Sequence, residues 1–199
     1  MKLSKISSIQ LLKKSIFATL TIGSFIVLQS FSTITEDVKI KGSTINWVGT
    51  KVTGSHEGTV NLQSGYLNFD NKDLVGGEFV IDMTSIVCTD LSGKGKASIE
   101  GHLKSDDFFS VDDFPSASLK ISDVKKQGLG DYMVTADITI KGTTQAITFK
   151  TVIEDETAKA TLIIDRTEFG IIYKSGNFFE ELADKAIYDE FEMTVNLKF

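Results

Sequence analysis

The 199-residue sequence has little of what marks a disulfide-rich protein or a common catalytic motif. Its single cysteine, Cys88, excludes a disulfide within the chain, so the fold has to be held by its core. It has one proline, Pro115, and one arginine, Arg166. G-x-S-x-G, P-loop and G-x-G-x-x-G motifs are absent, as are H-x-x-x-H and C-x-x-C ligand pairs. No sequence motif therefore indicates acyl transfer, nucleotide binding or a zinc centre.

Residues 1–32 contain no acidic residue. Lysines precede an apolar run at Ser15–Leu28, and small residues follow at Ser30 and Ser32. This order is typical of a secretory signal peptide, and the run is shorter than the roughly 20 residues that span a bilayer. We predict a signal peptide at 1–32, cleaved after Ser32, and a periplasmic or secreted domain at 33–199. The alternative is an N-terminal membrane anchor.

Negative charge dominates the predicted domain. It keeps 17 of the 21 basic residues and all 27 acidic ones, which leaves a net charge of −10. A domain this acidic repels phosphate backbones, so we expect no nucleic-acid partner.

Apolar residues occupy alternate positions over most of the chain from Val38 onward. The alternating stretches begin at Ile45, Gly65, Phe79, Tyr132, Ile147, Leu162 and Phe191. Period-two alternation gives a strand one apolar and one polar face, and Gly- and Asp-rich turns separate the stretches. The pattern predicts an all-β protein of roughly eight antiparallel strands, either a two-sheet sandwich or a closed barrel. An eight-stranded barrel with an apolar interior can hold one small ligand.

The segment Glu100–Ala117 interrupts this alternation with aromatic residues and paired aspartates. Just before it, Lys94–Lys104 places Ala97, Ile99 and Leu103 near one helical face, with Ser92 as a candidate cap. A second short helix is predicted at Asn177–Ala186. Both helices are expected to cover the ends of a barrel.

Three chemical hypotheses attach to the polar residues, and each has a simpler structural interpretation. Metal binding could use His56, His102 and Cys88, but their spacing is not that of a ligand set and His56 reads as a loop residue. Cys88 with a histidine could act as a nucleophile, although a thiol at the end of a strand explains it equally. The paired aspartates, Asp106–Asp107 and Asp112–Asp113, could serve a glycosidase, but such pairs commonly face water. We therefore expect no metal, no cofactor and no catalytic residue.

Arg166 is the only arginine among 20 lysines, and it follows an apolar strand directly. An isolated Arg among acidic residues suggests a directed, bidentate salt bridge. It could pair with an aspartate of Glu100–Ala117 and fix that segment to the barrel. The functional alternative is contact with an anionic ligand head group.

Three motifs together resemble the YceI-like proteins, also called polyisoprenoid-binding: EGHLKSDDFFSVDDFPSA at Glu100–Ala117, DRTEFGIIY at Asp165–Tyr173 and INWVGTKVTGSHEG at Ile45–Gly58. The resemblance covers about residues 38–199. It implies a lipocalin-like β-barrel whose apolar channel holds a polyisoprenoid or another long-chain amphiphile. One departure is the Lys94–Lys96 stretch with its extra glycines, which bears on the barrel entrance.

The alternation and the resemblance together predict an exported carrier that sequesters a long-chain amphiphile, such as a polyisoprenoid, an isoprenoid quinone, or a fatty acid or amide. The expected ligand-binding residues are Trp47, Phe79, Ile81, His102, Phe108, Phe109, Ile138, Ile140, Phe149, Arg166, Phe169 and Met193. Of these, Phe108 and Phe109 are expected at the mouth. His102 and Arg166, together with Lys104, are candidates for contact with the polar head.

Two alternatives stay open from the sequence: a stress-linked enzyme or redox accessory acting on a quinone-like ligand, and a barrel filled by its own side chains that acts as an interaction module. The sequence also leaves open a homodimer and a transient membrane contact for ligand exchange.

Overall fold

The computed structural model describes residues 35–179 and 182–199. Within them nine strands and three short helical segments are formed. The strands are β1 (Glu36–Lys39), β2 (Gly42–Lys51), β3 (Gly54–Asp70), β4 (Asp73–Cys88), β5 (Ser116–Lys126), β6 (Asp131–Ile140), β7 (Thr143–Glu154), β8 (Thr157–Asp165) and β9 (Ile187–Lys198). The helical segments are α1 (Gly93–Lys104), η1 (Arg166–Phe169) and η2 (Ala183–Lys185). The all-β prediction is confirmed.

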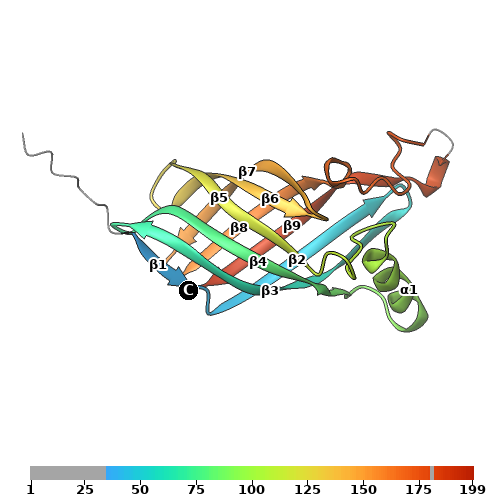
Figure 1. The fold of residues 1–199 in the computed structure, drawn as a ribbon, viewed down its shortest axis with the longest axis horizontal. Coiled ribbons are helices and arrows are strands. Elements are labelled where there is room, and N and C mark those ends of the chain that lie inside the picture. Colours follow the sequence, from blue (N-terminus) through green and yellow to red (C-terminus); the bar gives the residue numbers. More distant parts are fainter. Residues whose placement is uncertain (1–34, 180–181) are drawn as a thin grey trace, which may run out of the picture. The chain divides into compact units, whose positions relative to one another are not determined.

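Eight of the strands close into an antiparallel barrel (Figure 1). Neighbours follow the order β3-β2-β9-β8-β7-β6-β5-β4, and β4 pairs again with β3. The last strand, β9, closes the ring by pairing with both β2 and β8. Closure leaves no open edge in the ring, which removes the template for pairing with other chains. The short β1 adds to β3 outside the ring.

The predicted alternation places the apolar side chains inside the barrel. Strand β6 shows it most clearly, because every second residue from Tyr132 to Ile140 is buried while its neighbours are exposed or half-buried. A one-residue slip would reverse every side chain of a strand, so this pattern also fixes the pairing register.

The two ends of the barrel differ. At the end where β1 and the C-terminus lie, a buried cluster fills the interior, and the rings of Phe69 and Phe199 lie 5.5 Å apart between centroids (Figure 1). At the other end, α1 and the segment after it lie over the opening (Figure 1). The barrel is therefore packed at one end and covered at the other.

Two details of the helix predictions need correction. Ser92 stands at the N-cap of α1, but its side chain makes no capping bond, and Ala97 is exposed rather than directed at the barrel. The predicted helix at Asn177–Ala186 is wrong over its described residues, where only the single turn η2 forms. Ala183 has a φ of 50°, which is left-handed and incompatible with an α-helix.

The predicted signal peptide, residues 1–32, lies outside the described residues. Among the residues that the structure describes, no helix is long and apolar enough to cross a membrane.

The packed end should contribute directly to stability. Phe199→Ala is expected to lower the free energy of unfolding by about 3 kcal/mol, because it leaves a hole beside Phe69. Urea denaturation measures this. The exposed Phe178 is the matched control, and Phe178→Ala should change stability by less than about 0.5 kcal/mol. Equal small losses in both variants would contradict the packed end.

Candidate functional site: an apolar cavity in the barrel

A cavity of about 270 Å³ lies inside the barrel and is lined almost wholly by apolar side chains. Along β9 the lining runs from Ile187 to Leu197. Ten residues of strand rise about 33 Å, which a tilt of 35–45° reduces to about 25 Å along the barrel axis. The cavity is therefore long and narrow, and its volume lies near the lower end of the range of about 300–1,000 Å³ for ligand pockets.

Most of the predicted ligand-binding residues line this cavity. They are Trp47, Phe79, Ile81, His102, Phe108, Phe109, Ile138, Ile140, Phe149, Arg166 and Met193. Phe169 is buried in the core cluster but is not part of the cavity wall. Lys104, the third candidate for the polar head, does not line the cavity either. Contact of any of these residues with a ligand stays a prediction.

The cavity also uses residues that the sequence reasoning did not select. The additional apolar lining includes Ile45, Val60, Leu62, Met83, Ile86, Leu162, Ile164, Phe191 and Val195. All of them lie on the inward face of a strand, so the period-two pattern contained the signal. His56 is a correction: it belongs to strand β3 and lines the cavity rather than sitting in a loop.

Aromatic side chains from four parts of the chain meet at the covered end. His102 of α1 packs edge-on against Tyr173, with 4.4 Å between ring centroids, and against Phe108 at 5.3 Å. Phe108 contacts Phe109, which in turn reaches Phe191 of β9. Edge-to-face pairs of this kind add about 0.5–1.5 kcal/mol each beyond the area that they bury. The cluster therefore holds α1 and the following segment over the barrel opening.

Two polar atoms in the cavity wall have no hydrogen-bond partner among the described residues: Nε1 of Trp47 and Nε2 of His102. Burying such a group unpaired costs about 1–3 kcal/mol. The position of the indole is fixed by Gly58 on the neighbouring strand, where an added Cβ would lie 2.5 Å from the Trp47 ring. Trp47 and His102 therefore each bring a buried, unpaired ring nitrogen to the wall of an otherwise apolar cavity.

Arg166 is the one charged side chain in this wall that is almost fully buried, with 2% of its surface exposed. Nε donates to the carbonyl of Tyr188, Nη1 to that of Ile171 and Nη2 to that of Ile187. Nη2 also pairs with Asp189 Oδ1 at 3.2 Å. Burial lowers the pKa of Arg166 from its usual value, and the nearby carboxylates act against this shift.

The aspartate partner predicted for Arg166 is therefore wrong. The four aspartates of Glu100–Ala117 are exposed, and Asp189 at the start of β9 takes the ion pair instead. Arg166 still holds that segment, because its guanidinium lies 5.6 Å from the centre of the Phe108 ring, a cation–π contact.

The turn that carries Arg166 explains its neighbouring residues. Asp165 caps η1 through Oδ1, which accepts bonds from the backbone N–H and the hydroxyl of Thr167. Gly170 ends the turn with a φ of 75°, a conformation that favours glycine. The D-R-x-x-F-G pattern is thus a capped turn that aims the guanidinium inward.

Loss of Arg166 should unfold the covered end. Arg166→Met leaves three carbonyl groups without their donor and Asp189 with only its hydrogen bond from Asn177, so we expect a loss of about 3–5 kcal/mol in the free energy of unfolding. Urea denaturation provides the measurement, with the exposed Lys150→Met as the control expected to stay within about 0.5 kcal/mol. A cost below about 1 kcal/mol for Arg166→Met would show that the guanidinium has no structural role.

Known proteins share both sequence and fold with this chain. The YceI-like domain family matches residues 24–199. A UPF0312 protein of Vibrio parahaemolyticus is 30% identical over 144 residues, 70% of this chain and 73% of that protein. A UPF0312 protein of Shewanella denitrificans is 29% identical over 93 residues, so the match spans about half of either protein (47%).

Two solved structures have the same fold. The crystal structure of Burkholderia cenocepacia BcnA aligns with a TM-score of 0.62 at 21% identity, covering 78% of this chain and 94% of that one. A polyisoprenoid binding domain from Saccharophagus degradans aligns with a TM-score of 0.55 at 14% identity, covering 80% and 97%. The barrel, the three motifs and a family match over most of its length place this chain in the YceI-like family.

Proposed function

We propose that this protein is an exported carrier that sequesters a long-chain amphiphile in its barrel cavity and acts without catalysis. The observation that carries the proposal is the long apolar cavity, which runs from the aromatic cluster at the covered end to the packed cluster of Phe69 and Phe199. Export rests on the predicted signal peptide at 1–32.

The shape of the cavity favours a chain over a compact ligand. About 25 Å of axial length exceeds one leaflet of a bilayer, whose full hydrocarbon core is about 30 Å thick. Each CH₂ group that leaves water contributes about 0.8 kcal/mol. An isoprenoid chain can therefore be held with few polar contacts, and the dimensions suit it better than a bulky ring system. The Saccharophagus degradans domain, which is called polyisoprenoid binding, supports this choice.

The polar groups of the wall favour a neutral oxygen-bearing head over an anionic one. Arg166 already donates to three carbonyls and Asp189. Trp47 and His102 instead offer ring nitrogens without partners. The Trp47 N–H can donate to a carbonyl or hydroxyl oxygen of a quinone, an alcohol or an amide.

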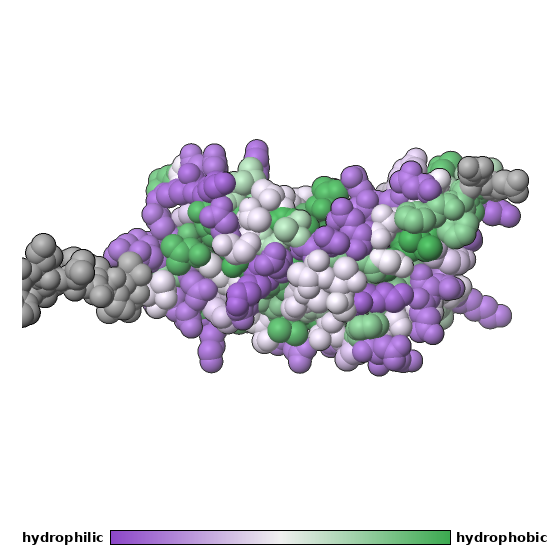
Figure 2. Space-filling view, turned by 45° about the horizontal axis from the view of Figure 1, so that its top comes forward, coloured by the Kyte–Doolittle hydropathy of each residue, from purple (hydrophilic) through white to green (hydrophobic). Residues whose placement is uncertain are grey.

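An exposed apolar group at the covered end suits ligand exchange with a membrane. Phe178, Phe179 and Tyr188 are each about half exposed, and Tyr188 also lines the cavity. Figure 2 shows hydrophilic residues spread over the barrel, with a hydrophobic patch at this end and smaller ones elsewhere. We propose that this surface meets the membrane transiently when the lipid ligand enters the cavity.

The cavity weighs against one of the two alternatives from the sequence, the barrel filled by its own side chains, and limits the residues that the other could use. A barrel filled by its own side chains would leave no long apolar space. An enzyme acting on a quinone would have to use other titratable residues of the described wall, among them the histidines His56 and His102, because Arg166 is held by protein atoms.

Blocking the cavity should abolish ligand retention. Ala160 lines the cavity and Thr161, its neighbour on β8, is exposed. Native mass spectrometry of protein purified without detergent should show a bound lipid of a few hundred daltons in the wild type and in Thr161→Trp. Ala160→Trp should lose it while keeping the circular dichroism of the fold. Ligand-free wild-type protein, with no gain in melting temperature on adding isoprenoids, would contradict the carrier.

Replacing His102 should raise the stability of the free protein and lower its affinity for a ligand. His102→Phe keeps a ring against Tyr173, so the free protein should gain about 1 kcal/mol while affinity for an isoprenoid quinone falls by roughly 3- to 10-fold. Trp47, the only tryptophan, lies in the wall and reports quinone binding through fluorescence quenching. Ile99→Leu, a volume-conserving change in the same wall, is the control and should alter neither quantity appreciably. Unchanged affinity in His102→Phe would show that His102 does not contact the head.

A further inference from the structure

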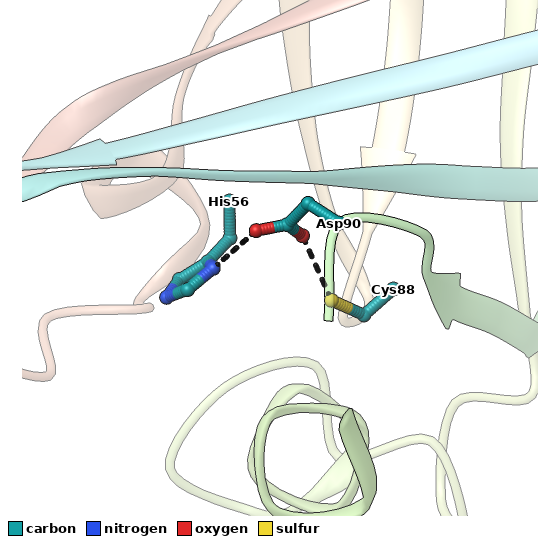
Figure 3. Close-up of side chains that lie close together, drawn as sticks. All are labelled: His56, Cys88 and Asp90. Atoms are coloured by element: carbon teal, nitrogen blue, oxygen red, sulfur yellow. Dashed lines mark hydrogen bonds and ion pairs between the residues drawn. The ribbon is translucent and has the colours of Figure 1, made fainter. Parts of the chain in front are cut away.

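Three side chains with metal-binding chemistry meet where β3 begins and β4 ends (Figure 3). Cys88 Sγ donates to Oδ1 of Asp90 at 3.0 Å, and Nδ1 of His56 lies 2.8 Å from Oδ2 of the same carboxylate. One ligand atom from each residue lies within 4.8 Å of the others. His56 and Asp90 are partly exposed, with 28% and 26% of their side-chain surface accessible, so an ion in solution can reach them.

The register of β3 and β4 brings these residues together. Gly58 pairs with Cys88, and the N–H of Thr89 donates to the carbonyl of Glu57 at 2.9 Å. The same antiparallel register continued by one step sets His56 opposite Asp90. Asp90 lies in the bend directly after the end of β4 at Cys88, and its carboxylate contacts both Cys88 and His56. The cluster is therefore a product of strand pairing, which local ligand spacing in the sequence does not show.

We propose that His56 Nδ1, Cys88 Sγ and a carboxylate oxygen of Asp90 bind a Zn²⁺ ion, with the fourth coordination position left to water. Imidazole, thiolate and carboxylate are the ligands that Zn²⁺ takes in proteins, and three of them with one open position is a known arrangement. The two negative charges of thiolate and carboxylate balance the charge of the ion. Zinc bond lengths of about 2.0–2.3 Å place tetrahedral ligand atoms about 3.5 Å apart. The contacts of Asp90 at 2.8 and 3.0 Å would therefore widen slightly, and no separation within the cluster, at most 4.8 Å, needs to contract by more than about 1.3 Å.

The metal-free cluster is held by protons that zinc would replace. Burial, together with the hydrogen bond to Asp90, raises the pKa of the Cys88 thiol, so the sulfur keeps its proton in the absence of metal. The bonds from Cys88 and His56 hold the pKa of Asp90 well below its usual value, so the carboxylate is charged and ready to bind. Binding forms the S–Zn bond, breaks the S–H bond and releases that proton to the buffer. His56 gives up the Nδ1 proton that it donates to Asp90 and takes one on Nε2, so the change of tautomer releases no further proton and frees Nδ1 for the ion.

Three other charged residues lie near the cluster: Glu57, Lys96 and Glu100. Glu100 of α1 accepts a bond from the backbone N–H of Cys88 at 2.8 Å and pairs with Lys96. Glu57 is adjacent to His56 on β3. A bound ion would tie the start of β3 to the segment between β4 and α1, and His56 is itself part of the cavity wall. Zinc would thus stiffen the mouth through which a ligand enters.

Zinc binding to the metal-free protein tests this directly. Calorimetric titration with Zn²⁺ should give one site per chain with release of about one proton, measured in buffers of different ionisation enthalpy. Cys88→Ala, His56→Ala and Asp90→Asn should each weaken binding by roughly 100-fold or more, because changing even a residue behind the ligands costs 10- to 100-fold. Asp112→Asn, an exposed carboxylate outside the cluster, is the control and should bind like the wild type.

A spectroscopic readout keeps the test independent of folding. Co²⁺ in place of Zn²⁺ should show a thiolate-to-cobalt charge-transfer band in the wild type and in Asp112→Asn but not in Cys88→Ala. Zinc should also raise the melting temperature of the wild type, reversibly on chelation, and leave that of Cys88→Ala unchanged. Absence of zinc binding, binding that is equal in Cys88→Ala and the wild type, or a cobalt complex without the thiolate band would overturn the site.

Discussion

Closure of the sheet is the constraint on which the rest of the structure depends. Strand β9 has to pair with β2 on one side and β8 on the other, and β4 has to return to β3. Eight tilted strands enclose an interior just wide enough for side chains or for one small ligand. The side chains fill that interior only at the end where Phe69 and Phe199 meet. The cavity is what remains, so ligand capacity is a consequence of strand number and of where the large side chains lie.

The covered end depends on a buried charge. Arg166 gathers the carbonyls of Ile171, Ile187 and Tyr188, which belong to chain segments with no regular hydrogen-bond ladder between them. A guanidinium suits this position because its donors point in several fixed directions. The flat face of the same group supports Phe108, so one side chain joins the turn after β8, the start of β9 and the segment that covers the barrel. This explains why a chain with 20 lysines uses one arginine here.

Local pattern predicted the strands and their inward faces, whereas the choice of a barrel over a sandwich came from the resemblance to the YceI-like family. Alternation at Tyr132–Ile140 or Phe191–Phe199 specifies which face is buried without knowledge of neighbours. It could not predict that Phe169 would pack outside the cavity wall, because η1 rather than a strand carries it. The sequence could not predict the partner of Arg166 either, since Asp189 is brought near only when β9 closes the barrel. His56 and Asp90 meet through the register of β3 and β4, which a ligand-spacing rule does not contain.

In the functional protein, the cavity should hold the hydrocarbon chain of a lipid ligand. Crystals of protein isolated from its native host without detergent test it most directly. The account predicts continuous, elongated electron density inside the barrel, running from the rings of Trp47 and His102 toward Leu197 and Phe199, with an oxygen atom within hydrogen-bonding distance of the Trp47 N–H. A barrel interior filled by rearranged side chains, or one that holds only separate water molecules, would contradict it.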